Sequence, residues 1–558
     1  MGGPIREITV VGGGTAGWLA AVMLRTQLNR RPGREPVRVT LVESPTLPTV
    51  GVGEATVPSM RELLKQLAID EGEFIRRCNV SFKLGVRFVD WDVDPRAGHR
   101  WYDHPFDGVG VDLQGVNAGY HFRKFGAAPG CGAFGDHISP STRLIDRYKG
   151  PKSIGQGEYD YRVGYAYHLD AGLFAGYLRE IGTERGVNHL LDDVDGVERD
   201  AAGLIAALRL REGGRWPVDL VIDCSGFRAL IIQQALEEPF IPYDRWLLND
   251  RAIPVQIPHA DPARLPPCTR STALEAGWSW RVPLWSRIGT GYVYSSAFKT
   301  DEEAIDEYLA HLGPAGAGAE PRVIRMRVGR SRRSWVGNCV AVGLSSGFIE
   351  PLESTAIYII EMSVRLLLSN LPDRDFDAAP RDRFNARMEA FYEEVRDFVA
   401  LHYIAAKRRD TPYWRAAGND LAVPDGLADR LERWKTALPA PDDFERTSLF
   451  GFWSYLIVLF GKGWYEGRRL ALDDGATEEG WRDFCRWMEG EKAKLVEALP
   501  DHYDLVRRLR GEDEEPEPLP IPAILPAGAP LSSVPLPGQA MRASVSWAAQ
   551  VDRAGSLL

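Results

Sequence analysis

The 558-residue sequence lacks the cysteine patterns that metal-binding and disulfide-rich proteins carry. It contains no CxxC pair and no cysteine spacing typical of a metal site, and its six cysteines are scattered: Cys78, Cys131, Cys224, Cys268, Cys339 and Cys485. Isolated cysteines are typical of reduced thiols inside the cell. We therefore expect a cytoplasmic protein without a metal centre.

Long apolar runs and an excess of positive charge are also missing. No segment stays apolar for long enough to span a membrane, and a strand predicted at residues 5–11 argues against a signal peptide. Lysine and arginine number 67 against 77 aspartate and glutamate residues, which gives a net charge of −10. This balance argues against a nucleic-acid-binding surface. The sequence predicts neither a membrane nor a nucleic acid as partner.

Glycine forms one phosphate-binding pattern near the N-terminus. The predicted strand at 5–11 runs into GGGTAG, and a helix is predicted over 18–28. Gly12 permits the tight turn, Gly14 lets the backbone approach a pyrophosphate, and Gly17 lets the helix pack on the strand. The residues predicted to bind the cofactor here are Gly12, Gly14, Thr15, Ala16 and Gly17.

Three further segments complete the signature of a flavin domain. Glu43 ends a strand predicted at 37–42, where an acid accepts hydrogen bonds from the adenosine ribose. Strands predicted at 203–210 and 218–222 lead into DCSGF, which starts at Asp223 and resembles the second flavin fingerprint of the glutathione-reductase-like class. Val194 is the predicted adenine contact. A second GxGxxG string, GCGAFG at 130–135, does not follow a predicted strand, so the sequence predicts no separate nicotinamide domain.

Two segments between these fingerprints have a functional and a plain interpretation. GVGEATVP at 51–58 is either a close-fitting strap over the flavin or an ordinary loop before a helix at 59–66; its predicted cofactor contacts are Val50, Gly51, Glu54 and Ala55. Residues 78–91 alternate like a half-buried strand, and Lys83 lies between Phe82 and Leu84. A lysine in such a run either extends to the surface or is held in the interior; for an arbitrary protein the surface is favoured.

The stretch 343–368 predicts an anion site. A strand predicted at 335–342 leads into a loop of small residues, and Ser354 and Thr355 take the N-cap place of an apolar helix. The first N–H groups of a buried helix are unpaired and partly positive, which suits a phosphate, a flavin edge or a halide. The plain alternative is a capped core helix whose neighbour Glu353 faces solvent.

The remaining chain sets the predicted architecture. The fold class is α/β (α+β overall), with a βαβ Rossmann core and a mixed substrate-binding sheet. Residues 275–287 contain Trp278, Trp280 and Trp285 and predict a stiff wall beside a cavity. We expect an FAD-binding core with interleaved sheet at 1–371, a helical lobe at 372–510, and a disordered acidic, Pro-rich tail at 511–558.

Together these motifs resemble the flavin-dependent halogenases of the tryptophan halogenase family. The resemblance covers most of residues 5–463 and rests on GGGTAG, GVGEATVP, SFK at 81–83, WSWRVP at 278–283 and FIEPLEST at 348–355. It implies that FAD, supplied as FADH2 by a separate NAD(P)H flavin reductase, reacts with O2. Halide would then attack the resulting peroxyflavin and release hypohalous acid.

The resemblance also implies roles for individual residues. Lys83 would steer the hypohalous acid onto an electron-rich aromatic carbon, and Glu353 would assist as electrophile activator or proton acceptor. A chloramine route needs the neutral amine of Lys83, whereas a hydrogen-bonding route needs the ammonium. Leu344 and Ile357 would contact the flavin, and Thr355 and Ala356 would hold the halide. The implied substrate contacts are His104, Phe106, Pro351 and Trp453.

Two departures from the family pattern bear on specificity. Ala356 replaces the glycine that commonly follows EST, which leaves the preference between chloride and bromide open. The tyrosine pair that grips free tryptophan is missing from DDFERTSLFGFWSY at 442–455. We therefore expect an indole or similar arene, with free tryptophan possible but not favoured. The alternative function is a single-component flavin-dependent aromatic hydroxylase. The oligomeric state stays open, with a homodimer as one option.

Overall fold

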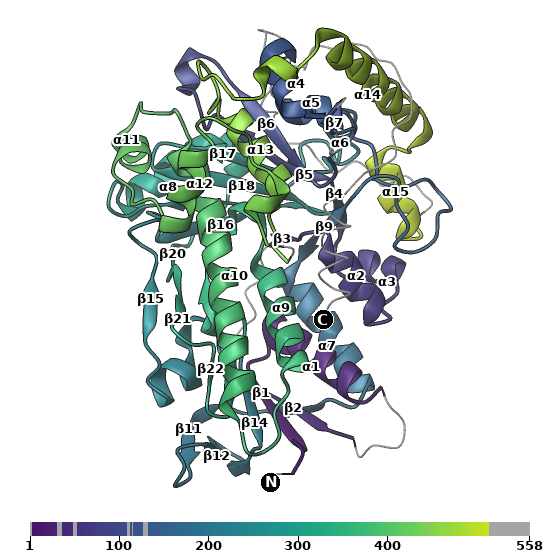
Figure 1. Ribbon diagram of the computed structural model, residues 1–558. Coiled ribbons are helices and arrows are strands. Elements are labelled where there is room, and N and C mark those ends of the chain that lie inside the picture. The colour runs from purple at the N-terminus through teal and green to yellow at the C-terminus, as the bar shows by residue number, and fades with distance from the viewer. Residues whose placement is uncertain are drawn as a thin grey trace.

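The computed structural model describes residues 3–30, 36–47, 53–108, 112–113, 115–126, 132–445 and 447–512. A six-stranded sheet with the order β10-β2-β1-β14-β23-β22 forms the lower part of Figure 1. Its strands are parallel except for β22 at the edge. They are β1 (Glu7–Val11), β2 (Arg38–Glu43), β10 (Asn188–Leu191), β14 (Leu220–Asp223), β22 (Trp335–Val336) and β23 (Cys339–Ala341). β14 and β23 are buried along their length, as parallel strands covered on both faces must be.

Helix α1 (Thr15–Leu28) connects β1 to β2 and packs against two other helices, α7 (Ala171–Glu184) and α9 (Ala356–Ser369). All residues from 17 to 24 are buried, which explains why this helix is apolar nearly all round. The strand, glycine turn and helix predicted at the N-terminus are confirmed.

A mixed seven-stranded sheet lies above this region in Figure 1, with the order β20-β16-β19-β18-β17-β5-β6. Only β5 and β17 pair in parallel; the other neighbours are antiparallel. Its strands are β5 (Gly85–Val89), β6 (Trp101–Pro105), β16 (Arg251–Ile257), β17 (Thr269–Ala273), β18 (Gly277–Pro283), β19 (Ile288–Tyr294) and β20 (Ile324–Arg325). WSWRVP forms most of β18, so this tryptophan-rich motif is a central strand of the sheet.

The described residues also form four smaller sheets. One has the order β3-β9-β4, and its strands are β3 (Gly53–Ala55), β4 (Ser81–Lys83) and β9 (Ala166–Asp170). The others comprise β11 (Val194–Arg199), β12 (Ile205–Leu210) and β13 (Gly214–Pro217); β15 (Phe240–Pro242), β21 (Gly329–Ser331) and β24 (Gly347–Phe348); and β7 (Asp112–Leu113) with β8 (Val116–Asn117).

The single strand predicted at 78–91 is wrong, because the chain changes sheets in the middle of this segment. β4 pairs with β9, whereas β5 pairs with β6 and β17. Between them the N–H of Leu84 donates to Pro267 O at 2.8 Å. A Cβ at Gly85 would lie 2.6 Å from His104 O, so only glycine lets β5 approach β6 this closely. Lys83 consequently ends a strand at the junction of two sheets.

The strand predicted at 335–342 is also wrong, because it is a tight hairpin of β22 and β23. Gly337 has a φ of +56°, a conformation that glycine adopts without strain. The Asn338 side chain fixes the turn: its Oδ1 accepts from Ile205 N and its Nδ2 donates to Ile205 O, both at 2.8 Å. The continuous apolar pattern concealed this reversal of direction.

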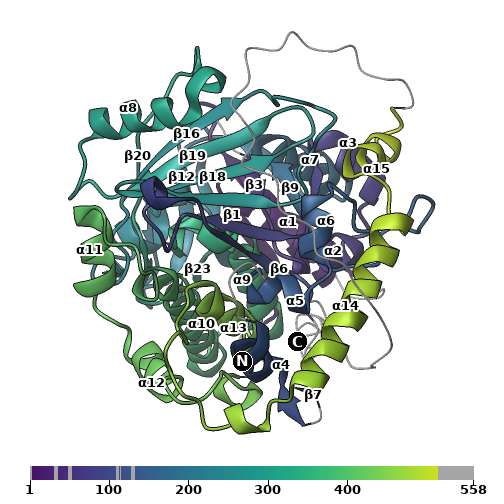
Figure 2. The same cartoon turned by 90° about the horizontal axis from the view of Figure 1, so that it is seen from above.

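The described elements after residue 371 are helical. The longest, α10 (Ala378–Ile404), runs beside α9 through the centre of Figure 1, and Figure 2 shows α14 (Glu478–Ala498) along one side of the molecule.

The other α-helices of the described chain, before and after residue 371, are α2 (Ser59–Gln66), α3 (Glu71–Arg77), α4 (Ala118–His121), α5 (Phe134–Ile138), α6 (Ser141–Asp146), α8 (Asp301–Leu312), α11 (Pro412–Asn419), α12 (Asp425–Arg433), α13 (Phe452–Gly461) and α15 (His502–Leu509). The domain boundaries stay a prediction, and almost all of the predicted tail, 513–558, lies outside the described residues.

None of the helices in the described ranges combines the length and the apolar character that a membrane span requires.

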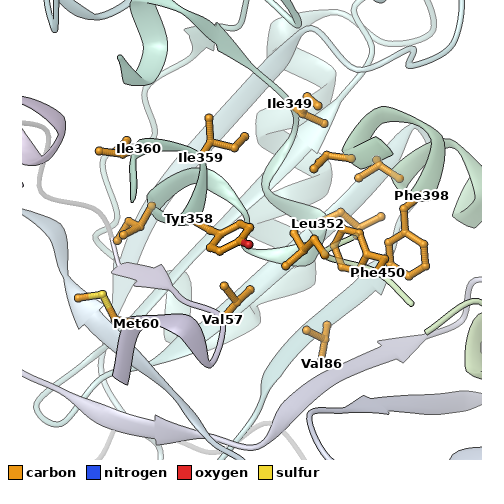
Figure 3. Close-up of a cluster of buried hydrophobic side chains, with 14 of the residues drawn as sticks. Val57, Met60, Val86, Ile349, Leu352, Tyr358, Ile359, Ile360, Phe398 and Phe450 are labelled. Atoms are coloured by element: carbon orange, nitrogen blue, oxygen red, sulfur yellow. The ribbon is translucent and has the colours of Figure 1, made fainter. Parts of the chain in front are cut away.

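One core joins α9 to the surrounding elements (Figure 3). Tyr358, Ile359 and Ile360 of α9 are buried; the Tyr358 ring lies next to Val57 in the view, and Leu352 lies next to Phe450 and Phe398. Phe398 stacks on Phe450 with ring centroids 3.9 Å apart. Because Leu352 directly precedes Glu353, this packing anchors the turn that carries the predicted catalytic glutamate.

Candidate active site

The glycine turn has the shape and polarity of a phosphate site. Gly12 has a φ of +117°, and a Cβ at Gly17 would lie 1.8 Å from Gly12 O, so both positions require glycine. Gly14 is the N-cap of α1 and receives no side-chain cap, and a Cβ there would meet no atom of the described residues within 4 Å. The start of α1 thus has no side-chain cap, and its first N–H groups carry partial positive charge, which fits the pyrophosphate of FAD.

Glu43 lies directly beside this turn. A Cβ at Gly13 would be 2.1 Å from Glu43 Cδ, so the middle glycine makes room for this carboxylate. Glu43 Oε2 is 2.8 Å from His189 Nε2, a partner that the sequence did not indicate. Glu43 therefore has the predicted location, and the histidine orients its carboxylate; its bond to a ribose stays a prediction.

Asp223 uses its side chain within the protein. Oδ1 accepts from Ser225 N at 3.0 Å, and Oδ2 accepts from Ile231 N and Ile232 N at 2.9 Å. The carboxylate thus ties β14 to the segment that follows it. Val194 begins β11 and packs on the apolar cluster around Val221. The predicted cofactor contacts of Asp223 and Val194 stay predictions.

The other predicted flavin contacts lie near the start of α9 and in β3. Leu344 is 38% exposed in the short turn Gly343–Ser345, and a Cβ at Gly343 would be 2.8 Å from the Cβ of Ala16. The loop before α9 therefore touches the glycine turn. Glu54 lies in β3, its side chain makes no hydrogen bond or ion pair among the described residues, and burial raises its pKa to about 7. Val50 and Gly51 lie outside the described residues, whereas Ala55 is in β3 and Ile357 is buried in α9.

Lys83 is held in the interior, with 0% of its surface exposed. Its Nζ donates to Thr56 O at 3.0 Å and to Ser354 Oγ at 2.8 Å, and it lies 4.9 Å from the ring centroid of Phe106. Burial lowers the pKa of Lys83 to about 7, although the negative charge of Glu353 acts to raise it. The surface placement favoured by local pattern is wrong, because the chain changes sheets at this residue.

Glu353 is also buried and is held between two histidines. His104 Nδ1 lies 3.1 Å from Oε1 and 3.2 Å from Oε2, and His402 Nε2 lies 3.0 Å from Oε1 without hydrogen-bond geometry. Burial acts to raise the pKa of Glu353, but the two neighbouring histidines, His104 above all, outweigh it and lower the pKa to about 2. The alternative that Glu353 faces solvent is therefore wrong.

Sequence reasoning missed His402. It lies near the end of α10, stacks on Phe88 with ring centroids 4.6 Å apart, and places Nδ1 3.3 Å from Tyr102 OH. Burial lowers the pKa of His402 to about 4, so the ring is neutral near pH 7. A single histidine at the apolar end of a long helix carries no motif, and no local signal could have identified it.

The start of α9 adjoins the lysine and the glutamate. Thr355 holds the N-cap position with φ −90° and ψ −8°, but no side chain caps the helix. Ser354, in the left-handed region with φ +61°, instead accepts the hydrogen bond from Lys83. The predicted side-chain cap is therefore wrong, because the strained turn directs the Ser354 hydroxyl to Lys83 instead of to the first N–H groups of α9. The N–H groups near Ala356 keep the polarity of an anion site.

Of the predicted substrate residues, His104, Phe106 and Pro351 lie at or beside Lys83 and Glu353, and Trp453 lies in α13 next to a residue that contacts His104. His104 Nε2 lies 3.1 Å from Ser454 Oγ, so the histidine links Glu353 to α13, where Trp453 is the preceding residue. Phe106 N donates to Leu84 O at 2.9 Å, which fixes Phe106 beside Lys83. Pro351 starts the three-residue turn Pro351–Glu353. Residues far apart in sequence thus converge on one buried lysine and one buried carboxylate.

Known proteins resemble this chain over most of its length. A family profile described as tryptophan halogenase matches residues 7–476. Tryptophan 6-halogenase SttH from Streptomyces toxytricini is 39% identical over 525 residues, which cover 89% of this chain and 97% of that protein. Tryptophan 7-halogenase RebH from Lentzea aerocolonigenes is 36% identical over 544 residues, covering 92% and 100%. The crystal structure of a tryptophan halogenase from Shewanella frigidimarina aligns with a TM-score of 0.84 at 33% identity, covering 91% of this chain and 98% of that one.

Proposed function

Because this chain belongs to the tryptophan halogenase family, we propose that it uses Lys83 and Glu353 to place halogen from hypohalous acid on an indole or similar ring. Members of this family are flavin-dependent enzymes that use FADH2, O2 and chloride or bromide. The observation that carries the proposal is that Lys83 and Glu353 are both buried at one turn. Lys83 donates a hydrogen bond to Ser354, and Glu353 is the residue directly before Ser354. A lysine and a glutamate this well buried need a task that repays their desolvation.

The chain offers a place for the flavin and for halide. Gly12, Gly14 and Gly17 would hold the pyrophosphate of FAD at the start of α1, and Glu43 would hold the ribose. When bound in its reduced form, the flavin would give two electrons to O2, and this activation would allow the oxygen to oxidise halide to hypohalous acid. Thr355 and the N–H of Ala356 would hold the halide ion, because they lie at the positive end of α9.

Lys83 would hold the hypohalous acid by a hydrogen bond to its oxygen. Two of the N–H groups of the ammonium point to Thr56 O and Ser354 Oγ, and the third is available to the acid. When the ring carbon attacks the halogen, the carbon–halogen bond forms and the halogen–oxygen bond breaks. The ammonium proton passes to the leaving hydroxide, which departs as water. We favour this hydrogen-bonding route over the chloramine route because hydroxide is a poor leaving group without that proton.

Glu353 would accept the proton that the ring carbon loses. Its pKa of about 2 keeps it ionised near pH 7, and its carboxylate is fixed from two sides by His104 and His402. Transfer of this proton back to the neutral lysine restores the starting state. The pair therefore returns one proton per turnover, and the net products are the halogenated ring and water.

The substrate proposal rests on the relatives and on one missing feature. SttH and RebH carry names that specify tryptophan, an indole. The segment 442–455 of this chain has no tyrosine pair to grip an amino acid, which favours indoles without that backbone. His104, Phe106 and Trp453 are the aromatic residues proposed to flank the ring.

We also propose that a separate flavin reductase supplies FADH2. Of the two GxGxxG strings, at 12–17 and 130–135, only the first follows a predicted strand, and that one is assigned to the flavin, which leaves no predicted nicotinamide domain. Membership of the halogenase family favours halogenation over the hydroxylase alternative. A homodimer is a further proposal, and light scattering of the purified protein tests it.

The experiment that tests the assignment uses Lys83→Ala. We expect halogenated product to fall at least about a hundredfold, the range of an acid–base residue, while flavin oxidation and hypohalous acid release continue. Lys65→Ala on the exposed surface of α2 is the control and keeps full activity. Full product formation by Lys83→Ala would remove this lysine from the reaction.

A further inference from the structure

A second buried carboxylate lies three residues before Glu353. Glu350 has 0% of its surface exposed and is the N-cap of the turn Pro351–Glu353. Its Oε2 accepts three hydrogen bonds: from Trp278 Nε1 at 2.9 Å, from Asn249 Nδ2 at 2.7 Å and from Tyr403 OH at 2.8 Å. Its other oxygen, Oε1, has no hydrogen-bond partner among the described residues.

The three donors come from separate elements. Trp278 is in β18, Asn249 precedes β16, and Tyr403 is near the end of α10. Asn249 is itself fixed, because its Oδ1 accepts from Tyr413 OH at 3.0 Å. None of these donors carries a charge, so the contacts act through their direction rather than through charge attraction. Such a convergent, fully buried set is the arrangement that fixes the position of a backbone turn.

The same part of α10 reaches both glutamates. Tyr403 bonds Glu350, and the residue before it, His402, lies 3.0 Å from Glu353 Oε1. Between the two glutamates the backbone is tight: Leu352 N donates to Glu350 O at 2.8 Å. Leu352 is buried, and Figure 3 shows its side chain next to Phe450 and Phe398. A shift of Glu350 would therefore move Glu353, and with it Ser354, the partner of Lys83.

We propose that Trp278 and Glu350 are positioning residues, whose hydrogen bond sets the place of Glu353 and Ser354 around Lys83. The inference rests on the function proposed above. It changes the role of the WSWRVP motif, which the sequence had suggested to be a wall that takes no part in the chemistry. The indole N–H of its first tryptophan acts on the reaction through Glu350, without touching substrate or cofactor.

Trp280 provides a matched control two residues along the same strand. It is half-buried, its ring lies 6.3 Å from that of Trp278, and its N–H makes no hydrogen bond among the described residues. Trp278→Phe and Trp280→Phe are therefore the same chemical change, and only the first removes a bond to Glu350. Tyr403→Phe removes a second donor from Glu350 and is the substitute if Trp278→Phe does not fold.

The measured quantity is coupling, the fraction of released hypohalous acid that appears as halogenated ring. We expect coupling to fall roughly tenfold in Trp278→Phe and in Tyr403→Phe, because a small misplacement of reacting groups is costly. Flavin oxidation stays at the wild-type rate in both variants. Glu350→Gln keeps coupling close to wild type, since its amide oxygen still accepts from the three donors, whereas Glu350→Leu loses it.

Two results would overturn the proposal. One is unchanged coupling in Trp278→Phe and Tyr403→Phe, and the other is an equal loss in Trp280→Phe. A crystal structure of Trp278→Phe gives a readout that needs no activity: an unmoved Glu353, still 3.0 Å from His402, would also contradict it. Failure of the proposed function is separate and would appear as wild-type protein that forms no halogenated product.

Discussion

Lys83 shows how one residue can be tuned by its surroundings. Its ammonium is desolvated, yet Thr56 O and Ser354 Oγ accept its N–H groups and the charge of Glu353 favours the proton. These opposing effects leave its pKa at about 7. The lysine is therefore poised to lose and regain a proton near neutral pH, which suits a group that gives its proton to a leaving hydroxide.

This pKa predicts the pH dependence of halogenation. Lys83 loses its proton as pH rises through about 7, whereas Glu353, with a pKa of about 2, is ionised throughout the range from pH 5 to 9. If the ammonium is the active form, coupling of hypohalous acid to product falls as pH rises through about 7. Flavin oxidation measured over the same pH range separates this effect from the flavin step. Coupling that instead rises through pH 7 would favour the neutral amine and the chloramine route.

At this scale the sequence identified Lys83 and Glu353 only through the resemblance to a family. The local pattern around Lys83 favoured the surface, because alternation cannot show that β4 ends where a second sheet begins. His402 and His189 carry no motif and were not predicted. Their roles depend on elements separated by tens to hundreds of residues, which a single sequence does not bring together.

At the scale of elements, the proposed flavin and halide sites both lie at the start of a helix. The starts of both α1 and α9 lack a side-chain cap, and each follows a turn with left-handed backbone, at Gly12 and at Ser354. Uncapped N–H groups retain their partial positive charge for an anion. The two starts lie close together, since Gly343 before α9 touches Ala16 of α1.

Gly14→Ala tests the first of these helix starts. The added methyl group would meet no described atom within 4 Å, so the fold should be kept while the space for a phosphate shrinks. We expect FAD affinity to fall roughly tenfold, about 1.4 kcal/mol, in equilibrium dialysis. Gly176→Ala in α7, where a Cβ also meets nothing within 4 Å, is the control. Unchanged FAD affinity in Gly14→Ala would place the pyrophosphate elsewhere.

Element types were more predictable than their connections. The strand, turn and helix at the N-terminus follow from the glycine pattern and the apolar periodicity, and the structure confirms them. The hairpin at Gly337 and the change of sheet at Leu84 were missed, since both occur within runs that remain apolar. In each case a tertiary partner, Asn338 with Ile205 or Leu84 with Pro267, decides the path of the chain.

At the scale of the whole molecule, the two large sheets position different parts of the proposed active site. The parallel sheet carries the glycine turn, and the mixed sheet lies at the lysine junction and contributes Trp278 to the anchoring of Glu350. α9 and α10 run side by side between these regions in Figure 1, so they connect the proposed flavin site to the proposed site of halogenation. This separation is consistent with a reactive species that forms at one place and is used at another.

The absence of a nicotinamide fingerprint in the sequence leads to a prediction for the complete system. Purified protein with FAD, NADH, halide and O2 should form no halogenated product and should not consume NADH. Addition of a generic flavin reductase, or of photochemically reduced FAD, should restore product formation. Rapid NADH consumption by the protein alone would contradict the proposed two-component system and support the hydroxylase alternative.

The most direct test of the central claim is mass spectrometry of a panel of indoles, tryptophan included, after incubation with wild-type protein or Lys83→Ala. Each reaction contains FAD, NADH, a flavin reductase and either chloride or bromide. We expect products with a halogen isotope pattern for the wild type, at least as strong for indoles without an amino-acid backbone as for tryptophan, and at least about a hundredfold less product for Lys83→Ala. Hydroxylated products, or halogenated products that do not depend on Lys83, would contradict the central claim.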